Sequence, residues 1–221
     1  ERVLDVYLTE AAVERHGEIW HEVVAAERYV HVASEQVMDA MSTDAQGVLA
    51  VVAAAEVTGS EALATALDGA RLVAVLTQAQ DPGNAGTIIR AADAAGADAV
   101  VLVRGSVDPT APKVVRSTAG SLFHLPVVTG VALDDAVAAL HEAGLTVLAA
   151  DGRGDFDLFE AESLLEAPSA WLLGNEAHGL PSEALSRADA VVSIPIYGKA
   201  ESLNVAAAAA VCLYASARAQ A

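Results

Sequence analysis

The stretch Leu72-Val-Ala-Val-Leu-Thr-Gln-Ala-Gln-Asp-Pro-Gly-Asn-Ala-Gly-Thr-Ile-Ile-Arg90 decides the fold. Its first six residues, 72–77, form an apolar run that is typical of a buried strand. Asp81-Pro-Gly-Asn84 is a strong turn signal, because proline and glycine favour sharp connections. A helix is predicted over 86–95, so the stretch reads as a strand, a turn and a helix.

The same alternation continues to the end of the chain. Strands are predicted at 72–77, 99–103, 125–128, 146–150, 170–173 and 190–194. Helices are predicted at 86–95, 111–117, 133–143, 182–186 and 203–217. This pattern predicts an α/β fold in which helices cover both faces of a parallel sheet. Ligands of such sheets bind beyond the carboxyl ends of the strands.

Residues 1–58 are predicted to form a separate, small α/β unit. The expected strands are 3–8, 29–33 and 48–53, and the expected helical pieces are 9–16 and 34–41. A strand-like run begins almost at once and no initiator methionine precedes it, so we expect this unit to be incomplete at its N-terminus. Residues 59–70, rich in alanine and glycine, are predicted to be a linker to a second domain over 71–221.

The composition predicts a folded protein without a membrane span. Of the 221 residues 54% are hydrophobic, which is enough for a sizeable core. The longest apolar stretch, 203–217, is mostly alanine and shorter than the roughly 20 apolar residues of a membrane helix. No secretion signal opens the chain, and the single cysteine, Cys212, fits a core position in a reducing compartment. We therefore predict a cytoplasmic location.

The charged and metal-ligating residues exclude some function classes and leave one question open. Six histidines lack cysteine or carboxylate partners at ligand spacing, so we predict no metal site and no zinc. The net charge of −18 argues against extensive non-specific nucleic-acid binding. Six cations nevertheless lie in loops or helix starts of the second domain, where they form either a local positive cleft or ordinary solvated side chains. These are Arg90, Arg104, Lys113, Arg116, Arg153 and Lys199.

Common nucleotide-binding and hydrolase motifs are absent. Gly152-Arg-Gly154 follows a predicted strand, but Asp157 stands where a dinucleotide-binding loop needs its third glycine. The chain contains neither a P-loop nor a Gly-x-Ser-x-Gly nucleophile elbow.

Three short segments place glycine beside polar groups next to an apolar run, as loops of one active site would. They are Asn84–Arg90, Leu173–Gly179 and Ile194–Asn204. Glycine at the end of a strand lets the backbone turn sharply and approach a ligand closely. Taken singly, each segment has an ordinary structural explanation: Arg90 as a surface residue about two turns into its helix, and Glu176 as a carboxylate that holds a loop.

Taken together, the segments resemble a known family. Asn84–Arg90, Gly174-Asn-Glu176 and Ser202-Leu-Asn204 match, in order and context, the three signature motifs of the TrmH/SpoU branch of SPOUT RNA methyltransferases, over 72–214. The resemblance implies a deep trefoil knot from about residue 170 to the C-terminus, and a homodimer whose sites are completed across the interface. The N-terminal unit is similar in kind to the small substrate-RNA-binding domain, related to a ribosomal protein fold, of many members.

The resemblance also implies S-adenosylmethionine as the cofactor, held by the loops of the knot. The residues that match its binding positions are Gly174, Ile194 and Leu203, with neighbours Leu173, Asn175 and Ile196. The residue types fit, because glycine at 174 would let the backbone approach an adenine and the aliphatic side chains would supply apolar faces. Ser202 is expected to be the N-cap of the terminal helix, with Asn204 in its first turn.

The implied reaction is transfer of a methyl group to a ribose 2′-hydroxyl of RNA. Arg90 matches the catalytic arginine, and the other matching positions are Asn84, Glu176, Ser202 and Asn204. Arginine stays protonated in proteins, so a role as general base is physically demanding. We favour a role for Arg90 in gripping an RNA phosphate and stabilising negative charge, with the proton passing to that phosphate or to water.

Ribosomal RNA is the favoured substrate over transfer RNA, because of the apparent accessory N-terminal domain. Two alternatives stay open. One is a non-catalytic RNA-binding or ribosome-assembly factor that keeps the fold, and the other is an enzyme that methylates a base nitrogen. The sequence identifies neither the nucleotide nor whether the role is housekeeping or antibiotic resistance.

Overall fold

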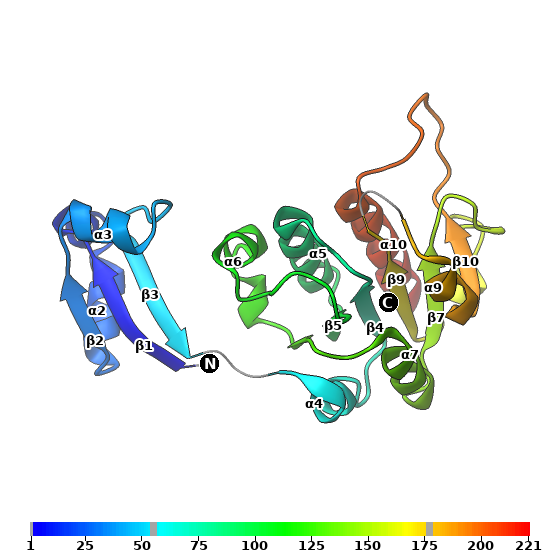
Figure 1. Ribbon diagram of the computed structural model, residues 1–221, viewed down its shortest axis with the longest axis horizontal. Coiled ribbons are helices and arrows are strands. Elements are labelled where there is room, and N and C mark those ends of the chain that lie inside the picture. Colours follow the sequence, from blue (N-terminus) through cyan, green and yellow to red (C-terminus); the bar gives the residue numbers. More distant parts are fainter. Residues whose placement is uncertain (1, 54–56, 176–178) are drawn as a thin grey trace. The chain divides into compact units, whose positions relative to one another are not determined.

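The computed structural model describes residues 2–53, 57–175 and 179–221, in two compact units. The units span Glu1–Glu56 and Val57–Ala221. Figure 1 shows the elements of both units along the chain.

The first unit is a three-stranded sheet with helices. Its elements are β1 (Arg2–Leu8), α1 (Glu10–Arg15), α2 (Gly17–Ala25), β2 (Tyr29–Val32), α3 (Glu35–Met41) and β3 (Val48–Ala53). The strand order is β2-β1-β3, with β1 parallel to β2 and antiparallel to β3. Val6 and Leu8 alternate along β1 toward one face, where they form a small core with Ala12 of α1. All three predicted strands are present, and α2 is a helix that the sequence analysis did not predict.

The second unit carries the remaining elements. They are α4 (Gly59–Ala66), β4 (Leu72–Leu76), α5 (Pro82–Ala94), β5 (Ala99–Leu102), α6 (Pro112–Thr118), the 3₁₀ helix η1 (Ser121–Phe123), β6 (Val127–Val128), α7 (Leu133–Glu142), β7 (Thr146–Ala150), β8 (Phe156–Asp157), α8 (Glu162–Leu165), β9 (Ser169–Leu173), α9 (Ser182–Arg187), β10 (Ala190–Ser193) and α10 (Val205–Gln220). Each strand predicted for this part of the chain is present. The short elements η1, β8 and α8 were not predicted.

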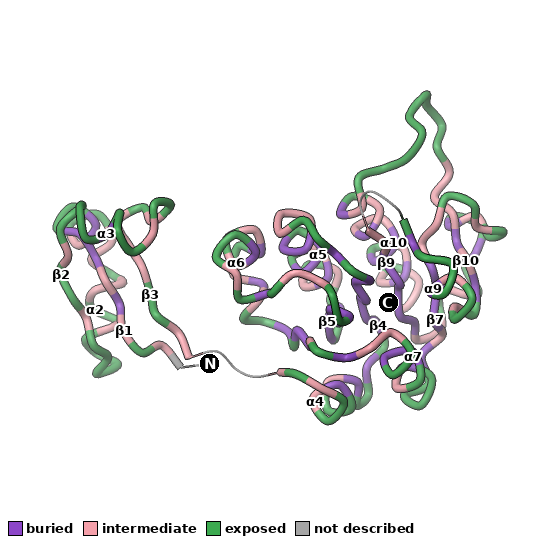
Figure 2. The backbone as a smooth tube through the Cα atoms, in the orientation of Figure 1, coloured by how far each residue is buried: buried purple, intermediate pink, exposed green. Residues whose placement is uncertain are grey.

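A seven-stranded parallel sheet organises this unit, with helices on both faces as predicted. The strand order is β6-β5-β4-β9-β7-β10-β8. All five residues of β4 are buried, and they alternate between the two faces. Leu72, Ala74 and Leu76 pack with α5 and α10, whereas Val73 and Val75 pack with α4 and α7. Figure 2 shows the strands β4 and β9 buried between these helices.

The C-terminal part of the chain crosses the sheet. Strand β9 lies between β4 and β7, and β10 lies on the far side of β7. Helix α10 then returns to pack against α5, β4 and β9. Tyr214 of α10 fixes this return by donating a hydrogen bond from its hydroxyl to the carbonyl oxygen of Ala94 at the end of α5, at 3.2 Å.

A buried hydrogen bond joins α10 to the centre of the sheet. The indole nitrogen of Trp171 donates to Ser216 Oγ at 2.9 Å, and both residues are fully buried. We expect Ser216→Ala to lower the free energy of unfolding by about 1–3 kcal/mol, because it leaves the indole N–H without a partner in the core. Urea unfolding measures this change.

Ser163→Ala is the matched control, because Ser163 is exposed. Its free energy of unfolding should stay within about 0.5 kcal/mol of the wild type. Equal effects of the two substitutions would contradict the assigned importance of the Trp171–Ser216 bond.

The structure differs from the predicted linker at 59–70. Most of that segment is helix α4, and Leu63 and Leu67 are buried in the core against α7. The two leucines are four residues apart and therefore share one face of the helix. Alanine and glycine around them hid this apolar face, and the boundary between the compact units lies at residues 56–57 instead.

Candidate active site

Four neighbouring strands end at the same edge of the sheet and bring the predicted segments together there. Leu76 of β4 pairs with Leu173 of β9, and Ala150 of β7 pairs with Val192 of β10. The loops that follow these strands start at Thr77, Gly174, Asp151 and Ile194. The candidate site therefore lies at the carboxyl edge, where a parallel sheet places its ligands.

Asn84 and Asn204 join the first and third segments directly. Asn204 Nδ2 donates to Asn84 Oδ1 at 3.1 Å, across 120 residues of chain. Asn204 Oδ1 accepts the backbone N–H groups of Ala206 and Ala207, at 2.9 and 3.3 Å. These two donors leave the amide nitrogen of Asn204 to face Asn84, so the orientation of this side chain is fixed by its surroundings.

The expectation that Ser202 caps the terminal helix is wrong. Asn204 is the N-cap, and α10 begins at Val205. Ser202 is exposed and forms no hydrogen bond with any residue in the described ranges. Asparagine is as good an N-cap as serine, so the sequence alone did not separate the two positions.

The second segment forms a closed loop after β9. Asn175 and Gly179 exchange two backbone hydrogen bonds, at 2.9 and 2.8 Å. Asn175 Nδ2 also donates to the carbonyl oxygen of Gln78 at 3.0 Å, which ties this loop to the end of β4. Glu176 lies outside the described residues.

Gly174 packs tightly against its own chain. A Cβ at this position would lie 2.4 Å from the carbonyl carbon of Gly179 and 2.6 Å from the nitrogen of Leu180. The close approach of residues 179–180 therefore explains why position 174 requires glycine. From the sequence we had expected the approach of an adenine to require it.

The predicted cofactor residues differ in exposure. Leu173 is buried in the core and Ile194 is half-buried against it. Ile196 and Leu203 are 39% and 40% exposed, on the loop between β10 and α10. Figure 1 shows this loop, in orange, extending from the ends of the two elements. The structure thus leaves two apolar side chains partly exposed on the loop that follows β10.

Asp151 lies beside the candidate site and was not singled out from the sequence. It follows β7, and a Cβ on Gly179 would lie 3.8 Å from its Oδ2, so Asp151 borders the loop after β9. Its carboxylate accepts from Arg153 Nε at 2.9 Å and from Arg153 Nη2 at 3.1 Å. The signal that could have found it is an aspartate placed directly after a buried strand, at the edge where ligands bind.

The hydrogen bond from Arg153 holds the pKa of Asp151 below its ordinary value, against the opposing effect of burial. A carboxyl with a lowered pKa stabilises the fold fully above its unfolded-state pKa of about 3.9, and this contribution is lost as the pH falls through the folded-state pKa. We expect Asp151→Asn to be less stable than the wild type at pH 7, with a difference that shrinks below about pH 4. Urea unfolding across this pH range tests the expectation.

Arg153→Gln is the companion variant, because it removes the partner of the same ion pair. The difference in unfolding free energy between Arg153→Gln and the wild type should also shrink below about pH 4. A stability difference for Asp151→Asn that does not change with pH would contradict the assignment of the pKa shift.

Arg90 forms no hydrogen bond with Asn84 or Asn204. It is exposed on α5 and forms no hydrogen bond or ion pair with another residue of the described ranges. Arg90 lies six positions after Asn84, which places their side chains about 120° apart around the helix. Within one chain, the arginine of the first segment therefore points to a different side of α5 from its asparagine.

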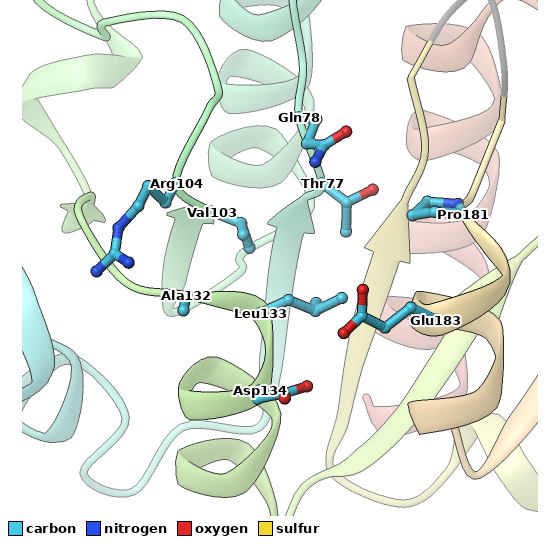
Figure 3. Close-up of a pocket in the computed structure, with 9 residues that line it drawn as sticks. All are labelled: Thr77, Gln78, Val103, Arg104, Ala132, Leu133, Asp134, Pro181 and Glu183. Carbon is cyan, nitrogen blue, oxygen red and sulfur yellow. The ribbon is translucent and has the colours of Figure 1, made fainter.

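A cavity of about 290 Å³ lies beyond the ends of β4 and β5, but it contains none of the predicted site residues. Its walls come from the ends of these strands and the starts of α7 and α9, as Figure 3 shows. The lining residues are Thr77, Gln78, Val103, Arg104, Ala132, Leu133, Asp134, Pro181 and Glu183. Thr77 links this cavity to the candidate site, because its hydroxyl donates to the carbonyl oxygen of Leu173 at 2.9 Å.

The structure also bears on Cys212, on metal-binding groups and on membrane-spanning helices. Cys212 is buried, and burial raises its pKa to about 12, which suits an unreactive core residue. Over residues 2–53, 57–175 and 179–221, no group of three or more His, Cys, Asp or Glu side chains is arranged to hold a metal ion. In the same ranges no helix has the length and apolar character that a membrane span requires.

Comparison with known proteins identifies what this arrangement is similar to. The sequence profile of the SpoU rRNA Methylase family matches residues 71–214. The chain is 43% identical over 157 residues to the 23S rRNA (guanosine(2553)-2'-O)-methyltransferase RlmP of Bacillus subtilis. The matched region is 70% of this chain and 59% of that protein, so the chain spans about three-fifths of the length of this curated relative.

Two solved structures are similar over almost the whole chain. The SpoU methyltransferase AviRb from Streptomyces viridochromogenes has a TM-score of 0.81 and 29% identity, covering 99% of this chain and 82% of its own. The AdoMet-bound rRNA methyltransferase from Sinorhizobium meliloti has a TM-score of 0.81 and 30% identity, covering 98% and 80%. Both structures share the α/β architecture described above.

Proposed function

Because the chain belongs to the SpoU rRNA methylase family, we propose that it transfers a methyl group from S-adenosylmethionine to a ribose 2′-hydroxyl of ribosomal RNA. The observation that carries the proposal is the Asn84–Asn204 hydrogen bond, which joins two separate sequence segments at the carboxyl edge of the sheet. The relatives named above are methyltransferases, so we do not propose the non-catalytic alternative.

The proposed cofactor residues are the six named from the sequence. They are Leu173, Gly174, Asn175, Ile194, Ile196 and Leu203. Their chemistry fits S-adenosylmethionine, because a purine needs apolar faces and the solvent-exposed Ile196 and Leu203 supply them at this edge. When bound, S-adenosylmethionine supplies the electrophilic methyl group. Leu173 is buried, so its contribution is through the backbone.

The catalytic task of the protein is to make a hydroxyl group nucleophilic. The cationic guanidinium of Arg90 holds an RNA phosphate and stabilises the negative charge that develops as the hydroxyl passes its proton to that phosphate or to water. The hydroxyl oxygen then takes the methyl group, and S-adenosylhomocysteine leaves. Asn84 and Asn204, fixed by their mutual hydrogen bond, orient the ribose. Ser202 and Glu176 complete the set as orienting groups.

A homodimer would complete this site. Support comes from Arg90, which is exposed on a different side of α5 from Asn84, so that it is free to serve the site of a second copy. The C-terminal segment from about residue 170 is proposed to thread a trefoil knot. The position of β9 between β4 and β7, and the return of α10 across the sheet, support the knot.

The first unit is proposed to bind substrate RNA, and the protein is proposed to act in the cytoplasm. Transfer RNA is the second candidate substrate. The preference for ribosomal RNA is supported by the relative that modifies 23S rRNA.

The decisive experiment is methyl transfer from radiolabelled S-adenosylmethionine to separate ribosomal and transfer RNA fractions, followed by alkaline and nuclease mapping. A 2′-O-methyl group blocks alkaline cleavage, so label in an alkali-resistant dinucleotide of ribosomal RNA is the expected result. Label in a base would contradict the ribose assignment. Absence of label with cofactor binding intact would contradict catalysis of RNA methylation by this chain.

A further inference from the structure

The cavity beyond the ends of β4 and β5 lies at the same edge of the sheet as the candidate site, yet none of the proposed catalytic or cofactor residues lines it. Its volume of about 290 Å³ is close to the lower limit of small-molecule sites, so it suits a single ring system. Asn175 Nδ2 donates to the carbonyl oxygen of Gln78 in the cavity wall, at 3.0 Å. A ligand in this cavity would therefore lie next to the loop that follows β9.

Gln78 has a backbone conformation that is rare for a residue with a side chain. Its φ of 55° lies in the left-handed region, where glycine is the favoured residue. Strain of this kind is found most often at functional sites. The side chain of Gln78 forms no hydrogen bond with any residue in the described ranges, so no contact within the chain accounts for a glutamine at this position.

Glu183 gives the cavity a carboxylate that forms no ion pair or hydrogen bond with any described residue. Asp134, the other carboxylate in the wall, accepts a hydrogen bond from Arg187 at 3.0 Å. Figure 3 shows the side chains of Thr77, Leu133 and Glu183 pointing into the same space. The cavity therefore favours a ligand that carries N–H donors, and it disfavours an anion.

The apolar part of the wall suits a flat ring. Val103, Leu133 and Pro181 line the cavity with aliphatic side chains. Proteins hold unstacked bases between such surfaces and read the base-pairing edge through hydrogen bonds. Guanine has two adjacent N–H donors on that edge, at N1 and N2, and the two oxygens of a carboxylate accept both. Adenine and cytosine offer only an amino group there, and uracil offers a single N–H.

We propose that this cavity binds an unstacked guanine of the RNA substrate, an inference that rests on the proposed function. Glu183 accepts hydrogen bonds from N1–H and N2–H of the base, and the amide of Gln78 donates to O6. Specificity for the base comes from these two side chains.

Arg104 at the edge of the cavity takes a phosphate of the same nucleotide. Figure 3 shows its side chain extending away from the other lining residues. The guanidinium donates to the carbonyl oxygen of Gly130 at 3.2 Å and forms no ion pair within the described part of the chain. A phosphate contact fixes the position of a nucleotide without selecting its base, so Arg104 and Glu183 have separable roles.

The test is equilibrium binding of nucleoside monophosphates to the whole chain, measured by NMR titration of isotope-labelled protein. S-adenosylhomocysteine is present at saturation, so that the proposed cofactor site is filled. The wild type should bind GMP roughly tenfold more tightly than AMP, the discrimination expected from one bidentate contact to a base. IMP keeps N1–H but lacks the amino group at N2, and its affinity should lie between the two.

Glu183→Gln should abolish the preference for GMP over AMP, because an amide offers one acceptor oxygen in place of two. Arg104→Gln should weaken the binding of both nucleotides by the same factor of roughly ten, because both carry the phosphate. Glu142→Gln is the matched control. Glu142 is exposed at the last position of α7, whereas the cavity lies at the first, so both affinities should equal those of the wild type.

Gln78→Gly separates a role in binding from a role in folding. Glycine removes the strain of the left-handed conformation, so the variant should need at least as much urea to unfold as the wild type. Its affinity for GMP should nevertheless fall roughly threefold to tenfold, because the donor to O6 is lost. A stability loss with unchanged GMP affinity would overturn the role given to Gln78.

The outcomes separate the guanine site from the proposed function. Equal affinities of the wild type for GMP and AMP overturn the guanine site, and so does a preference for GMP that survives Glu183→Gln. The proposed function stands in both cases if the wild type methylates RNA. If GMP binding depends on Glu183 and the chain methylates no RNA, the cavity is a guanine site and the proposed function fails.

Discussion

Arg90→Ala is expected to lower kcat for RNA methylation by about a thousandfold while cofactor affinity stays within a factor of two. Removal of one charged group that stabilises a transition state commonly costs this much. Cofactor binding should survive, because Arg90 is exposed and lies about 120° around α5 from Asn84, away from the Asn84–Asn204 pair. Single-turnover methylation and calorimetric titration with S-adenosylmethionine measure the two quantities.

Arg90→Lys is the informative companion, because lysine keeps the charge but loses the planar pair of donors. It should recover only part of the lost rate. A tenfold loss of cofactor affinity in Arg90→Ala would refute the assigned role, and so would a rate within tenfold of the wild type.

The sheet could be predicted from the sequence because its strands are buried on both faces. β4 and β9 are continuous apolar runs, and their pattern does not depend on which neighbour they pair with. The strand order could not be predicted in the same way. Insertion of β9 between β4 and β7 is set by long-range pairing, which leaves no periodic signal within either strand.

Alanine concealed other elements. The sequence predicts a linker in place of helix α4, because the buried Leu63 and Leu67 stand in an alanine-rich segment that begins with glycine. The elements β8 and α8 have only two and four residues, which is too short for a periodic pattern of apolar residues to be recognised. Packing against the rest of the unit decides the conformation of such segments.

The candidate site was predicted as a set of segments, and the structure adds how they meet. The contact between Asn84 and Asn204 follows from strands that end at one edge, as the sequence predicted. The capping role of Asn204 and the position of Asp151 beside Gly179 depend on loop geometry, which residue types alone do not specify. The side of α5 on which Arg90 lies could be stated only once the structure had shown that the helix already begins at Pro82.

The second large effect is expected from Gly174→Ala, which should lower the free energy of unfolding by about 3 kcal/mol or more. The added Cβ would lie within 2.7 Å of three backbone atoms of Gly179 and Leu180, and backbone atoms cannot rotate away as a flexible side chain can. Relief requires residues 179–180 to move and the two hydrogen bonds between Asn175 and Gly179 to break. Urea unfolding at one fixed protein concentration measures the loss, because the stability of the proposed dimer would depend on concentration.

Gly152→Ala is the matched control for this prediction. A Cβ on Gly152 would meet nothing within 4 Å, although the residue lies in the loop after β7 at the same edge of the sheet. The same chemical change should therefore leave stability within about 1 kcal/mol of the wild type. Similar effects of the two substitutions would show that the closure of the 174–180 loop does not depend on the missing side chain. A large loss at Gly174 alone would establish that backbone packing, and not only access for a ligand, requires glycine in the second segment.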